Sequence, residues 1–255
     1  MNEAAKAKAK KGKVQRGAAG GQATRQHVLD TAERLFATHG PEAVSIRTIA
    51  SEANVNLGAV NYHFTSKEKL FEEIFRRRVV PLNDQRLELL DNLLAQSGDK
   101  KLPALEKVVE AFVTPPLQLI ADASGSGRAL VVMQFLSHAF SSPGEAGFLE
   151  AYYEPVRTRY IEVLCQLLPH LAIEDVLWRY NYMVGAIIYA MGGPSRMTRL
   201  PRGLKRSERV RSGSADDAIR QLTTFAVAGF QAPSCGGPRP VISKSLEKGA
   251  RQTAG

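Results

Sequence analysis

The sequence predicts an all-α fold, and three observations support this prediction. Apolar residues recur at spacings of three and four along most of the 255-residue chain, which is the periodicity of amphipathic helices. Aromatic residues make up only 7% of the sequence, and Ala, Leu and Val dominate the apolar set, a composition that favours helices over strands. No stretch alternates between apolar and polar residues for long enough to indicate a sheet. The hydrophobic fraction of 44% is sufficient for one or two domains.

The N-terminal third of the chain predicts three helices in quick succession. The first begins at Thr24, whose side chain is an N-cap candidate, and stops at His39-Gly40-Pro41. Ser45 is placed to cap a short second helix, and Asn56 to cap a third after a turn at Asn54-Val55. The apolar positions of these helices are Val28, Leu29, Ala32, Leu35, Phe36, Ile46, Ile49, Ala50, Ala53, Leu57, Val60 and Phe64.

A fourth helix is predicted to begin with the capping box Thr65-x-x-Glu68 and to end near Pro81, because proline lacks the N–H that would continue a helix. Further helices are predicted at about 103–122 (broken at Pro115-Pro116), 126–141, 145–168, 173–192 and 214–231. The predicted organisation is a disordered basic arm over 1–22, a helix-turn-helix domain over 23–75, a helical domain over 76–232 and a disordered tail over 233–255.

The net charge of +9 is concentrated in segments with little to bury. Residues 1–25 carry seven Lys and Arg against one Glu, which gives +6, and residues 195–211 carry the same balance. A basic arm beside a folded domain can attract nucleic-acid phosphates, although the arm taken by itself is better explained as a solvated, disordered terminus. We interpret 195–213 as a surface loop whose contacts are left open.

The sequence contains no pattern typical of an enzyme, a cofactor site or a metal site. The two cysteines, Cys165 and Cys235, lie in unrelated contexts, and the glycine-rich pieces do not follow strands. No secretory signal is visible, and the most apolar run, 182–192, is far shorter than the roughly 20 residues that span a bilayer. We therefore expect a soluble cytoplasmic protein with no membrane partner, no cofactor and no bound metal.

The segment from Val44 to Phe64 has the properties of a helix-turn-helix, in which a second short helix enters a major groove about 12 Å wide. Ala50 is small where the two helices would cross. The outward-facing residues of the second helix are small or able to hydrogen-bond, which permits close approach to base edges and phosphates. This face comprises Leu57, Gly58, Ala59, Asn61, Tyr62 and His63.

Residues 25–75 resemble the DNA-binding domain of TetR-family repressors. The resemblance rests on Ala-Glu-Arg-Leu-Phe-Ala-Thr-His-Gly (32–40), Ser-Ile-Arg-Thr-Ile-Ala (45–50), Asn-Val-Asn-Leu-Gly-Ala-Val-Asn-Tyr-His-Phe (54–64) and Ser-Lys-Glu-Lys-Leu-Phe (66–71). It implies operator DNA as the partner, with contacts from Ser45, Arg47, Asn56, Leu57, Gly58, Ala59, Asn61, Tyr62, His63 and Lys67. Asn61 departs from the aromatic residue often found at its position, and an Asn side chain can pair with adenine.

The same resemblance implies a helical second half for dimerisation and ligand binding. The implied homodimer would use Tyr180, Met183, Val184, Ile187, Phe225 and Gly229. The run from Arg76 to Asn83, followed by Arg86, resembles the fatty-acid-sensing branch and implies a small hydrophobic effector such as a fatty acid or acyl-CoA. The pocket candidates are Phe112, Met133, His138, Tyr153, Arg157 and Tyr180, most of which could equally be core residues.

The function that these features predict is a ligand-responsive repressor, released from a palindromic operator when effector binding moves the fourth helix. Two other classes stay open at this point. One is an α-helical protein-interaction module whose basic arms bind partners other than DNA, and the other is an enzyme.

Overall fold

The computed structural model describes residues 3–98, 101–123, 127–141, 146–191 and 214–234, and every regular element within these ranges is a helix. The predicted loop at 195–213 and the tail from residue 235 lie outside the described residues. The helices, in chain order, are α1 (Glu3–His39), α2 (Ile46–Glu52), α3 (Leu57–His63), α4 (Lys67–Ser97), α5 (Leu105–Ala123), α6 (Gly127–Ser141), α7 (Ala146–Leu167), α8 (Ile173–Met191) and α10 (Ala215–Gln231).

Helix α1 begins earlier than the sequence predicted. The structure is helical from Glu3, where we expected a disordered arm, because the arm is rich in Ala and Lys, which favour the helical backbone. Thr24 is therefore not an N-cap: it lies inside α1, and its hydroxyl donates to the carbonyl oxygen of Gly20 at 2.9 Å. The predicted stop is confirmed, since Gly40 has a φ of 78° and its N–H donates to the carbonyl oxygen of Phe36.

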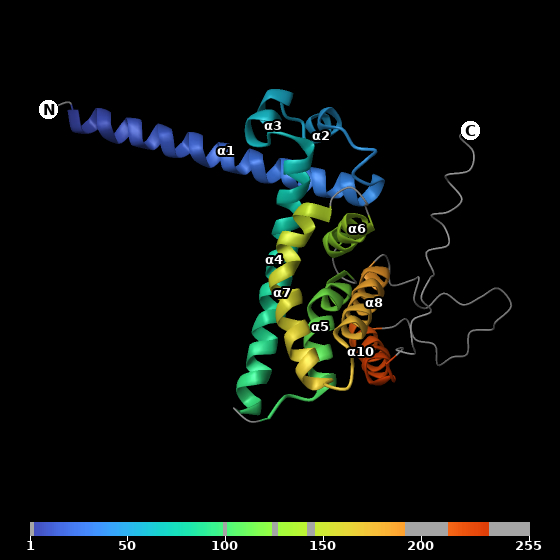
Figure 1. The fold of residues 1–255 in the computed structure, drawn as a ribbon. Coiled ribbons are helices and arrows are strands. Elements are labelled where there is room, and N and C mark those ends of the chain that lie inside the picture. Colours follow the sequence, from blue (N-terminus) through green and yellow to red (C-terminus); the bar gives the residue numbers. More distant parts are fainter. Residues whose placement is uncertain (1–2, 99–100, 124–126, 142–145, 192–213, 235–255) are drawn as a thin grey trace, which may run out of the picture.

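The helices form two connected groups (Figure 1). α2 and α3 lie together against α1 at one end of the molecule, while α4 runs from this end along α7 into the second group, where α5, α8 and α10 pack. Three aromatic rings join the groups: Phe71 of α4 lies 5.5 Å from Phe36 of α1 and 5.0 Å from Phe135 of α6, measured between ring centroids. All three side chains are buried, so one hydrophobic core continues from α1 into the second group.

The start of α4 and its predicted end both differ from expectation. Ser66, rather than Thr65, caps the helix, and its side chain accepts a hydrogen bond from the Lys69 N–H at 3.2 Å. Pro81 does not end α4, which continues to Ser97. The exposed Pro81 removes one backbone hydrogen bond, while buried residues on both sides, among them Val79 and Asn83, keep the helix packed.

Pro115 and Pro116 lie inside α5, where we predicted a break. Pro116 has no N–H to donate to the carbonyl oxygen of Phe112 one turn earlier. The buried Arg86 of α4 replaces that donor, because its Nε donates to the Phe112 carbonyl oxygen at 2.9 Å. A contact between distant parts of the chain therefore compensates for the helix-breaking residue.

Among the described helices, none is long and apolar enough to cross a membrane. Within the same residues, no group of three or more His, Cys, Asp or Glu side chains is arranged to hold a metal ion.

Candidate nucleic-acid interface

The α2–turn–α3 unit is built by short-range hydrogen bonds that its own residues supply. The Ser45 hydroxyl caps α2 by accepting from the Thr48 N–H at 3.1 Å, and the Asn56 side chain caps α3 by accepting from the Gly58 N–H at 2.7 Å. Between the helices, Asn54 adopts a φ of 51°, a backbone conformation that Asn tolerates better than most residues. All three predicted features, two caps and a turn, are confirmed.

Buried side chains fix this unit on α1. Ile49 of α2 and Val60 of α3 have no exposed surface, and Ala50 and Ala53 are nearly as buried. The ring Nε2 of His27 lies 3.1 Å from the carbonyl oxygen of Ala53, so a hydrogen bond from α1 also holds the end of α2. α3 is thus presented as a rigid element.

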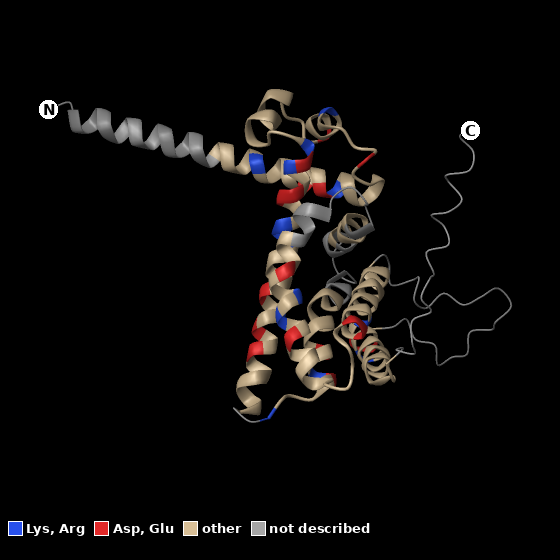
Figure 2. Cartoon of the chain, viewed as in Figure 1, with Lys and Arg blue, Asp and Glu red and all other residues tan. Residues whose placement is uncertain are grey.

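The outer face of this unit consists mainly of exposed polar or small residues. Tyr62 is 84% exposed and Leu57 is 36% exposed. The exposed residues of the predicted DNA-contact set are Ser45, Arg47, Asn56, Leu57, Gly58, Asn61 and Tyr62, while Ala59 is half-buried. α3 contains no Lys, Arg, Asp or Glu, and it is drawn without charge colours in Figure 2.

His63 and Lys67 are half-buried and contact the protein itself. The His63 ring lies 5.2 Å from the Tyr62 ring and close to Gly21 of α1. The Lys67 Nζ donates to the carbonyl oxygen of Pro41 at 3.1 Å, which ties the start of α4 to the loop that follows α1. Both residues have structural contacts in addition to the DNA contacts that the sequence predicted.

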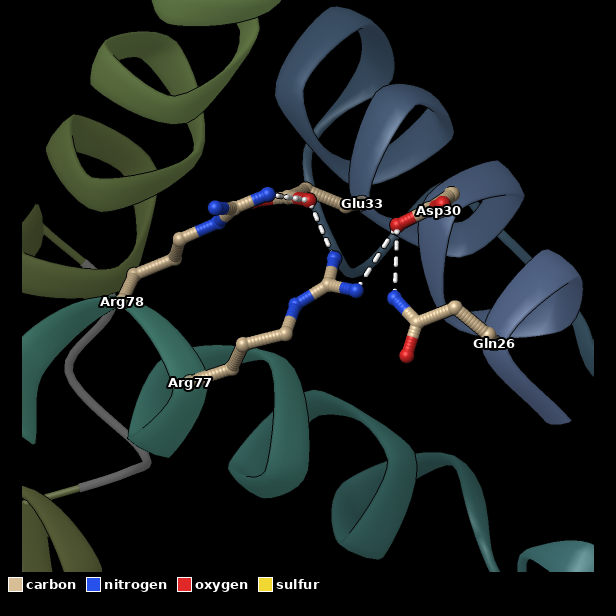
Figure 3. Close-up of polar contacts among 5 residues, drawn as sticks. All are labelled: Gln26, Asp30, Glu33, Arg77 and Arg78. Atoms are coloured by element: carbon tan, nitrogen blue, oxygen red, sulfur yellow. Dashed lines mark hydrogen bonds and ion pairs between the residues drawn. The ribbon is translucent and has the colours of Figure 1, made fainter. Parts of the chain in front are cut away.

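Four charged residues join α1 to α4 through hydrogen bonds, and we call them the α1–α4 ion-pair cluster: Asp30, Glu33, Arg77 and Arg78 (Figure 3). Glu33 is only 3% exposed and accepts from Arg77 Nη2 and from both Nε and Nη2 of Arg78. Arg77 Nη1 also donates to Asp30 at 2.7 Å. The cluster carries two positive and two negative charges, and it couples the helix behind the α2–α3 unit to the helix that enters the second group.

A small cavity lies among α4, α5, α6, α7 and α8, with a volume of about 20 Å³. Its lining is apolar apart from Arg86 and Tyr153. Arg86 is 4% exposed, and its Cζ lies 4.1 Å from the centroid of the Phe112 ring. Burial raises the pKa of Tyr153 and Tyr160 and raises that of Tyr180 to about 12, while the Arg86 charge opposes each rise. Sequence reasoning did not place Arg86 in a site.

The predicted pocket residues divide between the cavity and other places. Phe112 and Tyr153 line the cavity, and Tyr180 packs behind it with its ring 5.2 Å from that of Phe112. His138 does not line it: the side chain is exposed and approaches Gly40 at the end of α1. Arg157 is also outside the lining and pairs with Glu154 at 3.2 Å. The Met133 side chain lies outside the described residues.

The predicted dimerisation residues also divide. Tyr180, Met183 and Ile187 are at most 3% exposed and belong to the core of one subunit, so they cannot form a subunit interface. Their helical register turns them inward, and Val184 is half-buried. Phe225 is 68% exposed and Gly229 is exposed.

The outward side of α8 carries aromatic residues that sequence reasoning missed. Trp178, Tyr182 and Tyr189 are 63%, 65% and 56% exposed, and Gly185 lies between them with open space around it. Their spacing of four and seven places them on one side of the helix. Together with Phe225 and Gly229 of α10 we call them the α8–α10 face.

Comparison with known proteins identifies the family. The family model "Bacterial regulatory proteins, tetR family" matches residues 28–74, and "Tetracyclin repressor-like, C-terminal domain" matches residues 110–229. The HTH-type transcriptional repressor KstR2 of Mycolicibacterium smegmatis is 35% identical over 179 residues, which cover 67% of this chain and 81% of the relative. The HTH-type transcriptional regulator AcrR of Shigella flexneri is 42% identical over 67 residues, 26% of this chain and 31% of the relative.

The extent of the matches varies. Besides the 31% of AcrR, the chain spans 47% of the length of KstR2 from Rhodococcus jostii, with 33% identity over 108 residues. Two solved structures share the fold: a TetR-family transcriptional regulator from Bordetella parapertussis, with a TM-score of 0.52, and the ketosteroid transcriptional regulator KstR2 of Mycobacterium tuberculosis, with a TM-score of 0.50. Each is 18% identical, and each match covers 80% of this chain and 93% of the other.

The chain belongs to the TetR family, and its all-α architecture is the fold of that family. The relatives that share its sequence are transcriptional regulators and not enzymes.

Proposed function

We propose that this protein is a transcriptional repressor that binds a palindromic operator as a homodimer and releases it when a small hydrophobic effector binds. The observation that carries the DNA-binding part is the capped α2–turn–α3 unit, which presents α3 with an exposed, uncharged face. Named repressors among the relatives support the direction of regulation.

The proposed DNA contacts follow from exposure and chemistry. Asn61 and Arg47 are exposed and can hydrogen-bond base edges or the DNA backbone, and the exposed phenol of Tyr62 can hydrogen-bond a phosphate. Because Gly58 has no Cβ, the DNA backbone can approach α3 closely at this position. Lys67 at the first position of α4 combines its charge with the positive end of the helix dipole.

The α8–α10 face supports the homodimer. In a single subunit this face exposes Trp178, Tyr182, Tyr189 and Phe225 to solvent. Burial of such large aromatic side chains in an interface is energetically favourable. Gly185 and Gly229 have no atom within 4 Å of an added Cβ, so a second helix can approach closely there. A two-fold axis at this face would present two copies of α3 to the two half-sites of a palindrome.

The cavity beside Arg86 is the proposed effector site, and a fatty acid or acyl-CoA is the proposed class of effector. Its volume of about 20 Å³ holds roughly one water molecule, so effector binding requires the surrounding helices to separate. α4 borders the cavity and also carries Arg77 and Arg78 to α1. Separation at the cavity can therefore change the position of the α2–α3 unit, which amounts to selection of a second conformer.

A binding assay with DNA from upstream of the protein's own gene tests the proposal. We expect protection of a palindromic segment, with affinity that falls steeply as salt increases. Tyr62→Ala should weaken binding at least roughly tenfold, as expected for loss of a phosphate or base contact, while Lys107→Ala on the distant α5 should not. Equal binding to random and palindromic DNA at physiological salt would contradict the proposal and would favour the protein-interaction alternative.

A further inference from the structure

The guanidinium of Arg86 is buried among neutral partners. Its Nε donates to the Phe112 carbonyl oxygen at 2.9 Å, and its Nη1 donates to Asn83 Oδ1 at 3.2 Å. Within the part of the chain that the structure describes, no Asp or Glu carboxylate lies within 4.0 Å of it. The two half-buried arginines of α4, Arg77 and Arg78, by contrast pair with carboxylates in the α1–α4 ion-pair cluster.

An uncompensated buried charge is costly, and arginine cannot remove that cost by losing its proton. The hydrogen bond to Phe112 explains why a donor is needed beside Pro116, but a neutral amide would serve that carbonyl oxygen equally well. The face of the Phe112 ring, whose centroid lies 4.1 Å from Arg86 Cζ, attracts the guanidinium but carries no net charge, so the positive charge still lacks a counter-charge. An anion that enters from outside the protein would supply the missing counter-charge.

The cavity is where such an anion can reach Arg86. Arg86 belongs to the lining, and Tyr153 is the other lining residue with a polar side chain. The remaining walls are aliphatic or aromatic, with Leu82, Leu136, Val184 and Ile187 among them. A ligand that fits this environment has one anionic end and an apolar body.

We propose that Arg86 binds the carboxylate of the effector, and that the effector is therefore a hydrophobic carboxylic acid in its free, ionised form. This inference rests on the proposed function and makes it narrower. A carboxylate matches the planar fork of a guanidinium and neutralises its charge, whereas the carbonyl of a CoA thioester is a neutral acceptor and leaves the charge uncompensated. The free acid, rather than acyl-CoA, is the ligand that the site recognises.

Matched ligands test the inference on the full-length wild-type protein. Calorimetric titration with dodecanoate, 1-dodecanol and dodecanoyl-CoA compares an anionic, a neutral and a thioester end on the same chain. We expect dodecanoate to bind roughly 10- to 100-fold more tightly than dodecanol, the ratio typical of a hydrogen bond to a charged group. We expect dodecanoyl-CoA to bind more weakly than dodecanoate as well. Equal or tighter binding of either competitor, or no binding of dodecanoate, overturns the proposal.

Two variants locate the preference. Arg86→Gln keeps hydrogen-bond donors but removes the charge, so it should reduce the acid-to-alcohol ratio to near one, and Arg86→Lys should restore part of it. Arg159→Gln, an exposed arginine that pairs with Asp91, is the matched control and should leave the ratio unchanged. Retention of the full ratio in Arg86→Gln overturns the proposal. If this variant fails to fold, the wild-type ratio still decides.

The operator assay is run separately, so the two failures are distinguishable. Acid-selective binding without operator binding would leave the Arg86 site intact and refute the repressor function. Operator binding that dodecanoate and dodecanol release equally well would leave the repressor function intact and refute the Arg86 site.

Discussion

Replacing Glu33 with Gln tests how much the α1–α4 ion-pair cluster contributes to folding. Gln has nearly the same shape as Glu, so the change removes charge and one acceptor oxygen without creating a cavity. Glu33 accepts three hydrogen bonds from Arg77 and Arg78, and in the variant at least one of these donors faces an NH₂ group instead of an oxygen.

The magnitude follows from burial. The Glu33 side chain is 4% exposed, while those of Arg77 and Arg78 are 19% and 20% exposed, so water can only partly replace the lost acceptor. Breaking a fully buried pair by removing one partner costs roughly 3–5 kcal/mol, and a hydrogen bond to a charged group contributes about 1.5–3 kcal/mol. Because the arginines keep partial contact with water and Arg77 keeps Asp30, we expect a loss of about 2–4 kcal/mol.

Urea unfolding at one fixed protein concentration measures this loss, since association contributes to the stability of a dimer. Glu154→Gln is the matched control, because that residue makes an exposed pair with Arg157 and should change the free energy of unfolding by at most about 0.5 kcal/mol. If Glu33→Gln loses less than about 1 kcal/mol, or no more than the control, the cluster does not hold α1 on α4 as argued.

Three further predictions concern other parts of the molecule. The hydrogen bond from Arg76 is the largest cause that lowers the pKa of Glu73 below 4.5, so their pair stabilises the fold above that pH and ceases to do so as the pH falls through and below it. Arg76→Ala should therefore lower the free energy of unfolding by up to about 0.5 kcal/mol at pH 7, and this loss should shrink as the pH falls below 4.5; a loss that stays constant over that range would contradict this. Asn56→Ala should cost about 1 kcal/mol in urea unfolding by removing the α3 cap, and no loss would show the cap to be dispensable. Trp178→Ala should weaken self-association by roughly tenfold or more in sedimentation equilibrium, and an unchanged dissociation constant would place the dimer interface elsewhere.

Local features of the fold were predictable because their causes lie within a few residues. The caps at Ser45 and Asn56, the turn at Asn54 and the glycine stop after α1 each depend on a side chain next to the backbone group that it satisfies. The same reasoning was wrong at Pro116, because the donor that compensates for it is Arg86, 30 residues away in the sequence. A prediction of helix breaks that considers only neighbouring residues in the sequence cannot detect such a donor.

The assignment of helix faces was less predictable. α8 is apolar or aromatic on most of its circumference, so periodicity alone could not separate the core side from the outer side. Tyr180 and Tyr182 are two residues apart and chemically alike, yet one is 2% and the other 65% exposed. The packing of Tyr180 against Phe112 of α5 decides between them, and this contact depends on the tertiary structure. The sequence marked Arg86 only as part of a signature, and its neutral surroundings likewise depend on the tertiary structure.

Because α4 is long, a small tilt about one end of the helix moves its other end by several ångströms. Its 31 residues span about 46 Å at 1.5 Å per residue, so a tilt of about 5° about one end moves the other by about 4 Å. Arg86 lies in the C-terminal half of α4, near the proposed effector site, and Lys67 is the first residue of α4, beside the α2–α3 unit. In the proposed dimer, the two α2–α3 units, one beside the start of each α4, must fit half-sites about 34 Å apart. In the proposed mechanism, the unbroken passage of α4 through Pro81 lets a carboxylate bound at Arg86 move both α3 helices out of register with the two half-sites.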